Sequence, residues 1–329
     1  MGTKPTNVIQ RLSDLEANAG DTIKWDLLMQ MSQYGVTGDN EISGMEEELT
    51  YVQDEIKIDQ RRLAHAFRRM SSQRTLHDLR ADARSNLSDR FATIDDEILF
   101  AYLAGTAGTN NPALAAELAG DGFAGNALLE PADTGATTDA DHWVDSPTVL
   151  FTTDMVDIAY EKATTITPLM RPAIVDGQEL FIMIVHPYCI TDLRTATGTS
   201  IWRDMVALAH NRGSSNPLFT RATGMWGNVL IHESPRIPTS GTVSHSLFLG
   251  AQAGAIAFGN AYAKPKQTQY GTQNMMSWSE EEKDHGNRMS VAAGKVYGIK
   301  KAAFNYDDGM AYKRAFGVIR YDMKAQAHG

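Results

Sequence analysis

The sequence predicts an α+β fold, and three observations support this class. Helix-like and strand-like pieces alternate after Pro147 without a long repeat. A single long stretch with helical periodicity precedes them, over 71–104. The 329 residues are 43% hydrophobic and 21% charged, which is ordinary for a folded chain that buries a large core.

The charge balance and the cysteine count limit the classes of partner and site. Thirty Lys and Arg against forty Asp and Glu give a formal charge of −10, which disfavours tight binding of nucleic acid. A single cysteine, Cys189, excludes an internal disulfide and a four-cysteine zinc site, and is typical of a reducing cytoplasm. The longest uncharged stretch, 237–263, contains Pro238 and four glycines, so it indicates buried strands and turns rather than a membrane span.

The first sixty residues predict an arm followed by an acidic hairpin. Residues 1–34 are polar with scattered apolar positions, so we expect short structured pieces outside the core, and no signal core for export. Residues 35–59 carry a net charge of −7, are bent by glycines and alternate like a strand from Thr50 to Asp59. Such a hairpin cannot bury a core of its own and must lean on another surface.

One long amphipathic helix is predicted over 71–104. No Gly or Pro interrupts this stretch, and apolar residues recur at spacings of three and four. Ser71 or Ser72 is placed to cap the start, and Gly105 to end the helix in a left-handed conformation. At 1.5 Å per residue the helix would be about 50 Å long, which suits the spine of an elongated domain.

The rest of the chain predicts shorter elements. Residues 105–147 are rich in glycine, alanine and short polar residues and predict an irregular connection with a short helix at 113–119. Patterning predicts helices at 153–163, 188–195 and 201–209, and strands at 179–185, 229–232, 246–249, 290–301 and 315–323, with a turn-rich gap at 305–309.

Two motifs resemble sites of chemistry but have plainer interpretations. Gly120, Gly122 and Gly125 match G-x-G-x-x-G, yet a helix-prone segment precedes them where a dinucleotide site needs a strand, so we expect a glycine-rich loop. Cys189 follows His186 by three residues, but a lone cysteine after an apolar strand is usually a buried small hydrophobe.

Two acidic clusters are also weighed as cation sites. Asp133, Asp139, Asp141 and His142 lack the spacing of a calcium loop, so we prefer a solvated loop, with a bound cation as the alternative. The run 280–285 is interpreted as an exposed acidic turn. We therefore predict no catalytic residue, no cofactor and no metal site.

A basic block follows the acidic hairpin directly. Residues 61–90 hold eight arginines against three aspartates, a net charge of +5. The hairpin can fold back on this block within one chain, or reach the block of a neighbouring subunit, which repeats head-to-tail and closes rings. The second arrangement would use Glu46, Glu47, Glu48, Asp54, Glu55, Asp59, Arg61, Arg62, Arg68, Arg69, Arg74, Arg80 and Arg84 as interface residues.

Short motifs in a fixed order extend this interpretation over nearly the whole chain. They are found at 20–25 (GDTIKW), 44–47 (GMEE), 56–61 (IKIDQR), 73–74, 78–80, 94–96, 103–105, 186–187, 216–219 (NPLF), 249–253 (LGAQA), 298–301 (GIKK), 304–305 and 316–319 (FGVI). With these motifs the sequence resembles the major capsid proteins of N-four-like podophages and related tailed phages.

The resemblance implies the Hong Kong 97-type capsid fold with five regions. These are an N-terminal arm at 1–34, an extended E-loop hairpin at 35–70, a P-domain at 71–150 with the spine helix 71–104, an A-domain at 151–262, and return strands to the P-domain with a C-terminal strand at 263–329. In this fold the E-loop lies over the P-domain of a neighbouring subunit. Loops 120–147 and 306–314 are longer than the family pattern, which leaves a surface role or a decoration-protein contact open.

The implied function is that of a major capsid protein without enzymatic activity. It would self-assemble as hexamers and pentamers into the icosahedral head of a tailed bacteriophage, enclosing double-stranded DNA that it contacts non-specifically. Further expected partners are portal, scaffolding and cement or decoration proteins, with no membrane. The protein would reside in the virion after assembly in the host cytoplasm. The alternatives are an encapsulin-like shell of a bacterial nanocompartment, a phage decoration or scaffolding protein, and a soluble hydrolase that uses Cys189.

Overall fold

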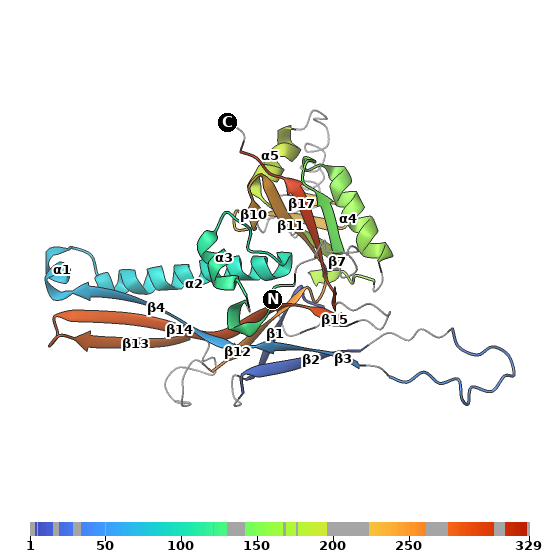
Figure 1. Cartoon of the computed structure of the whole chain (residues 1–329), viewed down its shortest axis with the longest axis horizontal. Coiled ribbons are helices and arrows are strands. Elements are labelled where there is room, and N and C mark those ends of the chain that lie inside the picture. Colours follow the sequence, from blue (N-terminus) through green and yellow to red (C-terminus); the bar gives the residue numbers. More distant parts are fainter. Residues whose placement is uncertain are drawn as a thin grey trace.

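The computed structural model describes residues 4, 6–15, 20–28, 34–49, 51–120, 122–129, 142–166, 169–175, 177–195, 224–260, 276–305 and 313–327. Its helices and strands form a mixed α+β architecture, as predicted. The molecule is elongated: an arm extends to one side, a long loop extends to the other, and a body of sheet and helices stands above them (Figure 1).

The arm is a five-stranded sheet that carries one long helix. The strands are ordered β1 (Ile9–Leu15), β12 (Gly254–Gly259), β14 (Arg288–Lys301) and β13 (Met276–Lys283), and β4 (Asp59–Arg68) pairs with β14. The 14-residue β14 runs through the whole sheet, because its outer part pairs with β13 and β4 and its inner end with β12. Helix α2 (Leu79–Ala104) packs on this sheet through Leu87 and Phe91.

The long helix is shorter at its start than predicted. Helix α2 begins at Leu79, with a carboxylate oxygen of Asp78 accepting bonds from the backbone N–H groups of Arg80 and Ala81. The expected caps Ser71 and Ser72 instead lie inside a separate six-residue helix, α1 (Arg69–Arg74). An aspartate that satisfies two free N–H groups defines a stronger start than a serine with none. The predicted end is correct, since Gly105 has φ 76° and its N–H donates to the carbonyl of Tyr102.

The body is a second, eight-stranded sheet between two layers of helix. Its main path is β5 (Trp143–Ser146), β17 (Val318–Lys324), β11 (Val243–Leu249), β7 (Gln178–Val185), β9 (Val229–Glu233) and β8 (Gly224–Trp226), while β10 (Thr239–Ser240) pairs with β11 and β6 (Ala173–Val175) with β7. Phe248 faces α4 (Thr153–Thr165) and α5 (Pro187–Thr195), whereas Leu247 and Leu249 face α2. The described part of the uncharged stretch, 237–260, is therefore mainly buried strand and turn, as predicted.

The N-terminal segment is more deeply integrated than predicted. Strand β1 pairs in parallel with β12, and Ile9 and Leu12 are buried. Strand β2 (Thr22–Leu28) pairs with β3 (Tyr51–Lys57), and Ile23 and Trp25 are also buried. The expectation that residues 1–34 stay outside the core was wrong for these strands, because each has a partner strand whose edge would otherwise be unpaired.

Among the remaining short elements, the predicted helix at 113–119 is confirmed, whereas the strand predicted at 315–323 begins only at Val318. Helix α3 (Pro112–Leu118) and the 3₁₀ turn η1 (Phe123–Gly125) interrupt the irregular connection after α2. Strands β15 (Ala303–Asn305) and β16 (Lys313–Ala315) pair with each other. The predicted helix at 201–209 lies outside the described residues, as does most of the predicted gap at 305–309. No helix in the described part of the chain is long and apolar enough to span a bilayer.

Candidate assembly surfaces

The loop between β2 and β3 is one candidate surface, and residues 34–49 of it are called the acidic loop below. The acidic loop carries five carboxylates and no Lys or Arg: Asp39, Glu41, Glu46, Glu47 and Glu48. Four large apolar side chains on it face solvent, and they are Tyr34, Ile42, Met45 and Leu49. Exposed apolar groups that alternate with charge are typical of a surface that another molecule covers.

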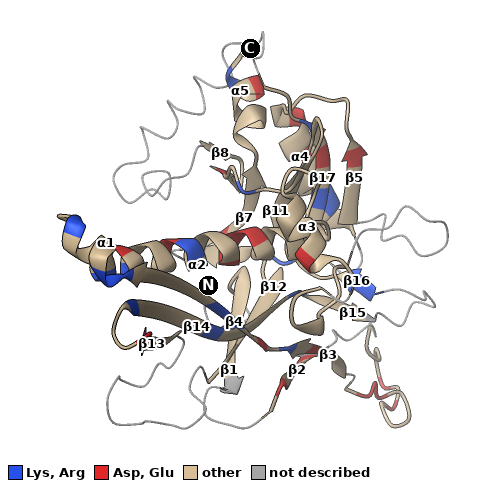
Figure 2. Ribbon diagram, turned by 60° about the vertical axis from the view of Figure 1, so that its left-hand side comes forward, with Lys and Arg blue, Asp and Glu red and all other residues tan. Residues whose placement is uncertain are grey.

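The opposite end of the molecule is basic. We call α1, residues 62–68 of β4 and the first turns of α2 the basic tip. In Figure 2 the blue ribbon segments that mark Lys and Arg gather there, far from the red Asp and Glu segments of the acidic loop beside β3. Arg62, Arg68, Arg69 and Arg74 of the basic tip are exposed.

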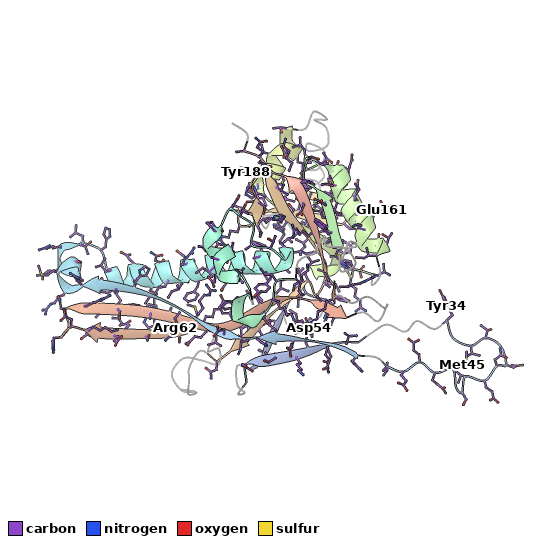
Figure 3. The ribbon with its side chains drawn as sticks, in the orientation of Figure 1. Tyr34, Met45, Asp54, Arg62, Glu161 and Tyr188 are labelled. Carbon is purple, nitrogen blue, oxygen red and sulfur yellow. The ribbon has the colours of Figure 1, made fainter. Side chains whose placement is uncertain are left out.

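The two candidate surfaces cannot pair with each other in this conformation. Tyr34 and Met45 lie at one end of the long axis, and Arg62 lies on the arm that extends to the other end (Figure 3). The carboxylates therefore point away from the arginines of the same chain. This conformation differs from the fold-back arrangement and leaves both surfaces available to other copies.

Some of the predicted interface residues have partners within the chain. Asp54 is buried and accepts bonds from Lys300 and Lys313. Arg61 pairs with Glu117 of α3 and lies over the ring of Phe123. These contacts hold Asp54 and Arg61 inside the subunit, so their charges are satisfied there.

Two arginines of α2 are also engaged, at the surface of the arm. Arg80 donates to Glu280 of β13, and Arg84 lies 5.0 Å from the ring centre of Trp278. The Trp278 indole N–H also donates to Glu280, and this bond, followed by the bonds from Arg80, lowers the pKa of Glu280. A groove of about 460 Å³ between α2 and β13 is lined by these side chains. Both arginines remain exposed. Glu55 and Asp59 are exposed as well, at the base of the hairpin.

The features with plainer interpretations behave accordingly. Cys189 is buried in the body core, and burial raises the pKa of its thiol to about 12. Gly120 and Gly122 lie between α3 and η1, Gly125 ends η1, and all three have positive φ. Glu280–Glu282 lie on exposed β13 and Asp284 begins the turn to β14, so only the end of that run is a turn.

The proposed cation cluster is only partly visible. Asp133, Asp139 and Asp141 lie outside the described residues, while His142 is buried. Within the described ranges no group of three or more metal-ligating side chains converges.

A buried network in the body was not anticipated from the sequence. Asp322 accepts bonds from His245 Nδ1 at 2.6 Å, from Arg320 Nε at 2.8 Å and from the Trp143 indole at 2.9 Å. Burial alone would raise the pKa of Asp322, but the bonds from His245 and Arg320 lower it to about 2. His245 Nε2 lies 2.8 Å from Ser240 Oγ. The carboxylate is shared among three donors, which makes this arrangement a packing network across β5, β11 and β17.

Comparison with known proteins places the whole chain among capsid proteins. The family model described as phage capsid protein matches residues 1–327. The major capsid protein of Pseudomonas phage KPP25 is 25% identical over 348 residues, covering 97% of this chain and 88% of that protein. The capsid of Ralstonia phage GP4 is 30% identical with a TM-score of 0.83, covering 100% of this chain and 90% of that one. The Cyanophage Pam1 capsid is 20% identical with a TM-score of 0.68, at 99% and 91% coverage.

The encapsulin alternative has weaker support. The holo-SrpI encapsulin of Synechococcus elongatus PCC 7942 shares 11% identity and a TM-score of 0.52, over 97% of this chain and 87% of that one, which is a likeness of fold alone. The fold is that of the Hong Kong 97-type capsids, as the resemblance implied.

Proposed function

The chain belongs to the phage capsid protein family and is a major capsid protein of a tailed phage, and we propose that its acidic loop binds the basic tip of a neighbouring subunit. Copies of the protein associate into the shell of the virion. The proposal concerns how one copy holds the next.

The position of the two surfaces at opposite ends of the long axis is the observation that carries this proposal. A contact between unlike patches at opposite ends is heterologous, so each copy offers one of each and the series closes by rotation into a ring. Hexamers and pentamers are such rings.

Charge and apolar contact have separate roles in this interface. The five carboxylates face a tip whose arginines include Arg62, Arg68, Arg69 and Arg74. Individual exposed ion pairs contribute little, about 0.2 to 1 kcal/mol, but they set partner choice and register. The apolar side chains of the acidic loop, Met45 and Ile42 among them, supply the area that leaves water. Asp54 and Arg61 are paired with residues of the same chain, so we assign them a role within the subunit.

The finer regions and partners belong to the same proposal. The arm with α2 corresponds to the P-domain, the body to the A-domain and the β2–β3 hairpin to the E-loop. We further infer assembly in the host cytoplasm, contacts with portal, scaffolding and cement proteins, non-specific contact with packaged double-stranded DNA, and no catalytic role. The total charge of −10 supports weak contact with DNA, since an inner shell surface that bound phosphates tightly would hinder packaging of the genome.

Charge reversal in the acidic loop tests the proposal. Glu46, Glu47 and Glu48 are changed together to lysine, and the expected result is folded subunits that no longer form shells. A matched variant reverses three exposed carboxylates of the body, Asp154, Glu161 and Glu179, and is expected to assemble. Electron microscopy counts the particles and circular dichroism reports folding. Normal shells from the loop variant, or an equal loss from both, would refute the intersubunit contact.

A further inference from the structure

The hairpin that carries the acidic loop joins the arm at one junction in the chain, between β3 and β4. Strand β3 ends at Lys57 and belongs to the ladder with β2, whereas β4 begins at Asp59 and belongs to the ladder with β14. Only Ile58 separates the two ladders. A rotation of the backbone at this point would change the direction of the hairpin relative to the arm, which the contacts of Asp54 with Lys300 and Lys313 also hold.

The side chain of Asn126 binds both backbone polar groups of Lys57 at this junction. Its Oδ1 accepts from the Lys57 N–H at 2.9 Å, and its Nδ2 donates to the Lys57 carbonyl at 2.8 Å. A carboxamide thus pairs with one residue as a neighbouring strand would. The N–H of Ile58 is bound separately by the carbonyl of Asp21, at 2.9 Å. Asn126 is buried, so these bonds are shielded from water.

Asn126 is in turn fixed to the end of the long helix. The hydroxyl of Tyr102, on the last turn of α2, lies 2.6 Å from the Asn126 carbonyl and 3.0 Å from that of Phe123, and accepts from the Phe123 N–H at 2.7 Å. Burial raises the pKa of Tyr102 to about 12, so its proton stays available for donation. Figure 1 shows η1 beneath α2 and beside the inner end of β4, where this link runs.

Two glycines make the close approach possible. A Cβ at Gly122 would lie 2.2 Å from the Asn126 carbonyl oxygen and 2.7 Å from the Tyr102 hydroxyl. A Cβ at Gly298 would lie 1.9 Å from the Lys57 carbonyl oxygen. Backbone segments of η1, β3 and β14 are therefore packed against one another with no room for a side chain.

We propose that Asn126 is a positioning residue that fixes the direction of the acidic loop relative to helix α2, and with it the angle at which neighbouring subunits meet. The link runs from Tyr102 through Asn126 to Lys57 and joins the helix to the hairpin by hydrogen bonds alone. The second half of this inference rests on the proposed function, in which the acidic loop contacts a neighbour.

A distance measurement in unassembled subunits tests the first half independently of any neighbour. Spin labels are attached through Met45→Cys on the acidic loop and Leu76→Cys beside the basic tip, both exposed positions. Cys189 is buried with a raised pKa and stays unlabelled in the folded chain. Asn126→Ala in this background is expected to broaden and shift the distance distribution between the labels and to speed hydrogen exchange at the Lys57 N–H.

The matched control is Asn111→Ala. Asn111 also makes two side-chain hydrogen bonds, accepting from the Leu114 N–H and donating to Glu97, but it touches no part of the hairpin base. Its variant should keep the narrow distribution. If Asn126→Ala fails to fold, Asn126→Asp takes its place: it keeps the acceptor for the Lys57 N–H and replaces the donor by a charged oxygen that repels the Lys57 carbonyl.

The same variants without labels are then assembled and their shells measured by electron microscopy. Asn126→Ala is expected to give a wider spread of shell diameters, or tubes, while Asn111→Ala gives the parental diameter. An unchanged distance distribution in the Asn126 variants overturns the positioning role. A broadened distribution with parental shells overturns the link between loop direction and subunit angle, whereas failure of the charge-reversal test alone would leave the positioning role intact.

Discussion

Asp54 on β3 and Lys300 on β14 form a buried ion pair, with Lys300 Nζ 2.7 Å from Asp54 Oδ1. Lys313 approaches the same oxygen at 2.9 Å from β16. The side chain of Asp54 is 1% exposed, that of Lys300 10% and that of Lys313 37%. The two lysines therefore differ in how much of their charge is shielded by water.

Removing the more buried lysine should cost more stability than removing the other. Lys300→Met leaves a buried carboxylate with only its half-exposed partner, and we expect a loss of roughly 3 kcal/mol in the free energy of unfolding. Lys313→Met removes a pair that water already screens, and we expect a loss below about 1 kcal/mol. Urea unfolding followed by circular dichroism measures both. Equal losses would contradict the role assigned to burial.

Substitution of Gly105 tests the end of helix α2. Its φ of 76° is strained for a β-branched side chain, so Gly105→Val should lower the free energy of unfolding by roughly 1 kcal/mol or more. Gly105→Asn is the matched control, because asparagine tolerates the left-handed conformation and should cost less. Thermal melting compares the two. A wild-type melting temperature for the valine variant would reject the left-handed cap.

The start of α2 can be tested in the same way. Asp78→Ala removes the acceptor for two backbone N–H groups and should cost about 1 kcal/mol. Ser72→Ala lies inside the short α1 and should change stability by a few tenths of a kcal/mol at most. Chemical unfolding measures the loss of stability in both variants. A larger loss for Ser72→Ala than for Asp78→Ala would support the helix start predicted from the sequence and contradict the start seen in the structure.

The low pKa of Asp322 predicts a specific pH dependence. Its folded pKa of about 2 lies below its ordinary value near 4, so the ionised carboxylate adds stability that is full above pH 4. This contribution is lost as the pH falls from about 4 towards 2. Asp322→Asn cannot ionise, and its free energy of unfolding should fall less steeply over that range. Parallel slopes for the two proteins would exclude Asp322 as a source of acid sensitivity.

Local patterns predicted the elements whose signals lie within one segment. The turn-to-turn periodicity around Phe91 and the glycine at position 105 predicted the helix and its end. The continuous apolar run around Phe181 and Met183 predicted strand β7 as a buried strand. These signals depend only on residues close in the chain, so they can be recognised without knowledge of the fold.

Long-range pairings were beyond such reasoning. Arg61 was predicted to serve a neighbour, yet it lies on a strand paired with β14, more than two hundred residues further along, and meets Glu117. The residues around Asp54 in the sequence do not indicate that Asp54 is buried and paired with two distant lysines. Asn126 likewise has no signal of its own, because its partners at Lys57 and Tyr102 come from other elements. Partner choice in a sheet is a property of the whole chain.

The single residue between β3 and β4 has a consequence for how the protein can vary in length. Side chains on a strand alternate between faces, so one inserted residue at Ile58 would exchange the faces of β4 and turn Leu63 and Phe67 from α2 to solvent. Insertions in residues 34–49 would instead lengthen a segment that packs against no core of its own chain. The reach of the hairpin is thus free to diversify among variants, while its point of departure is not.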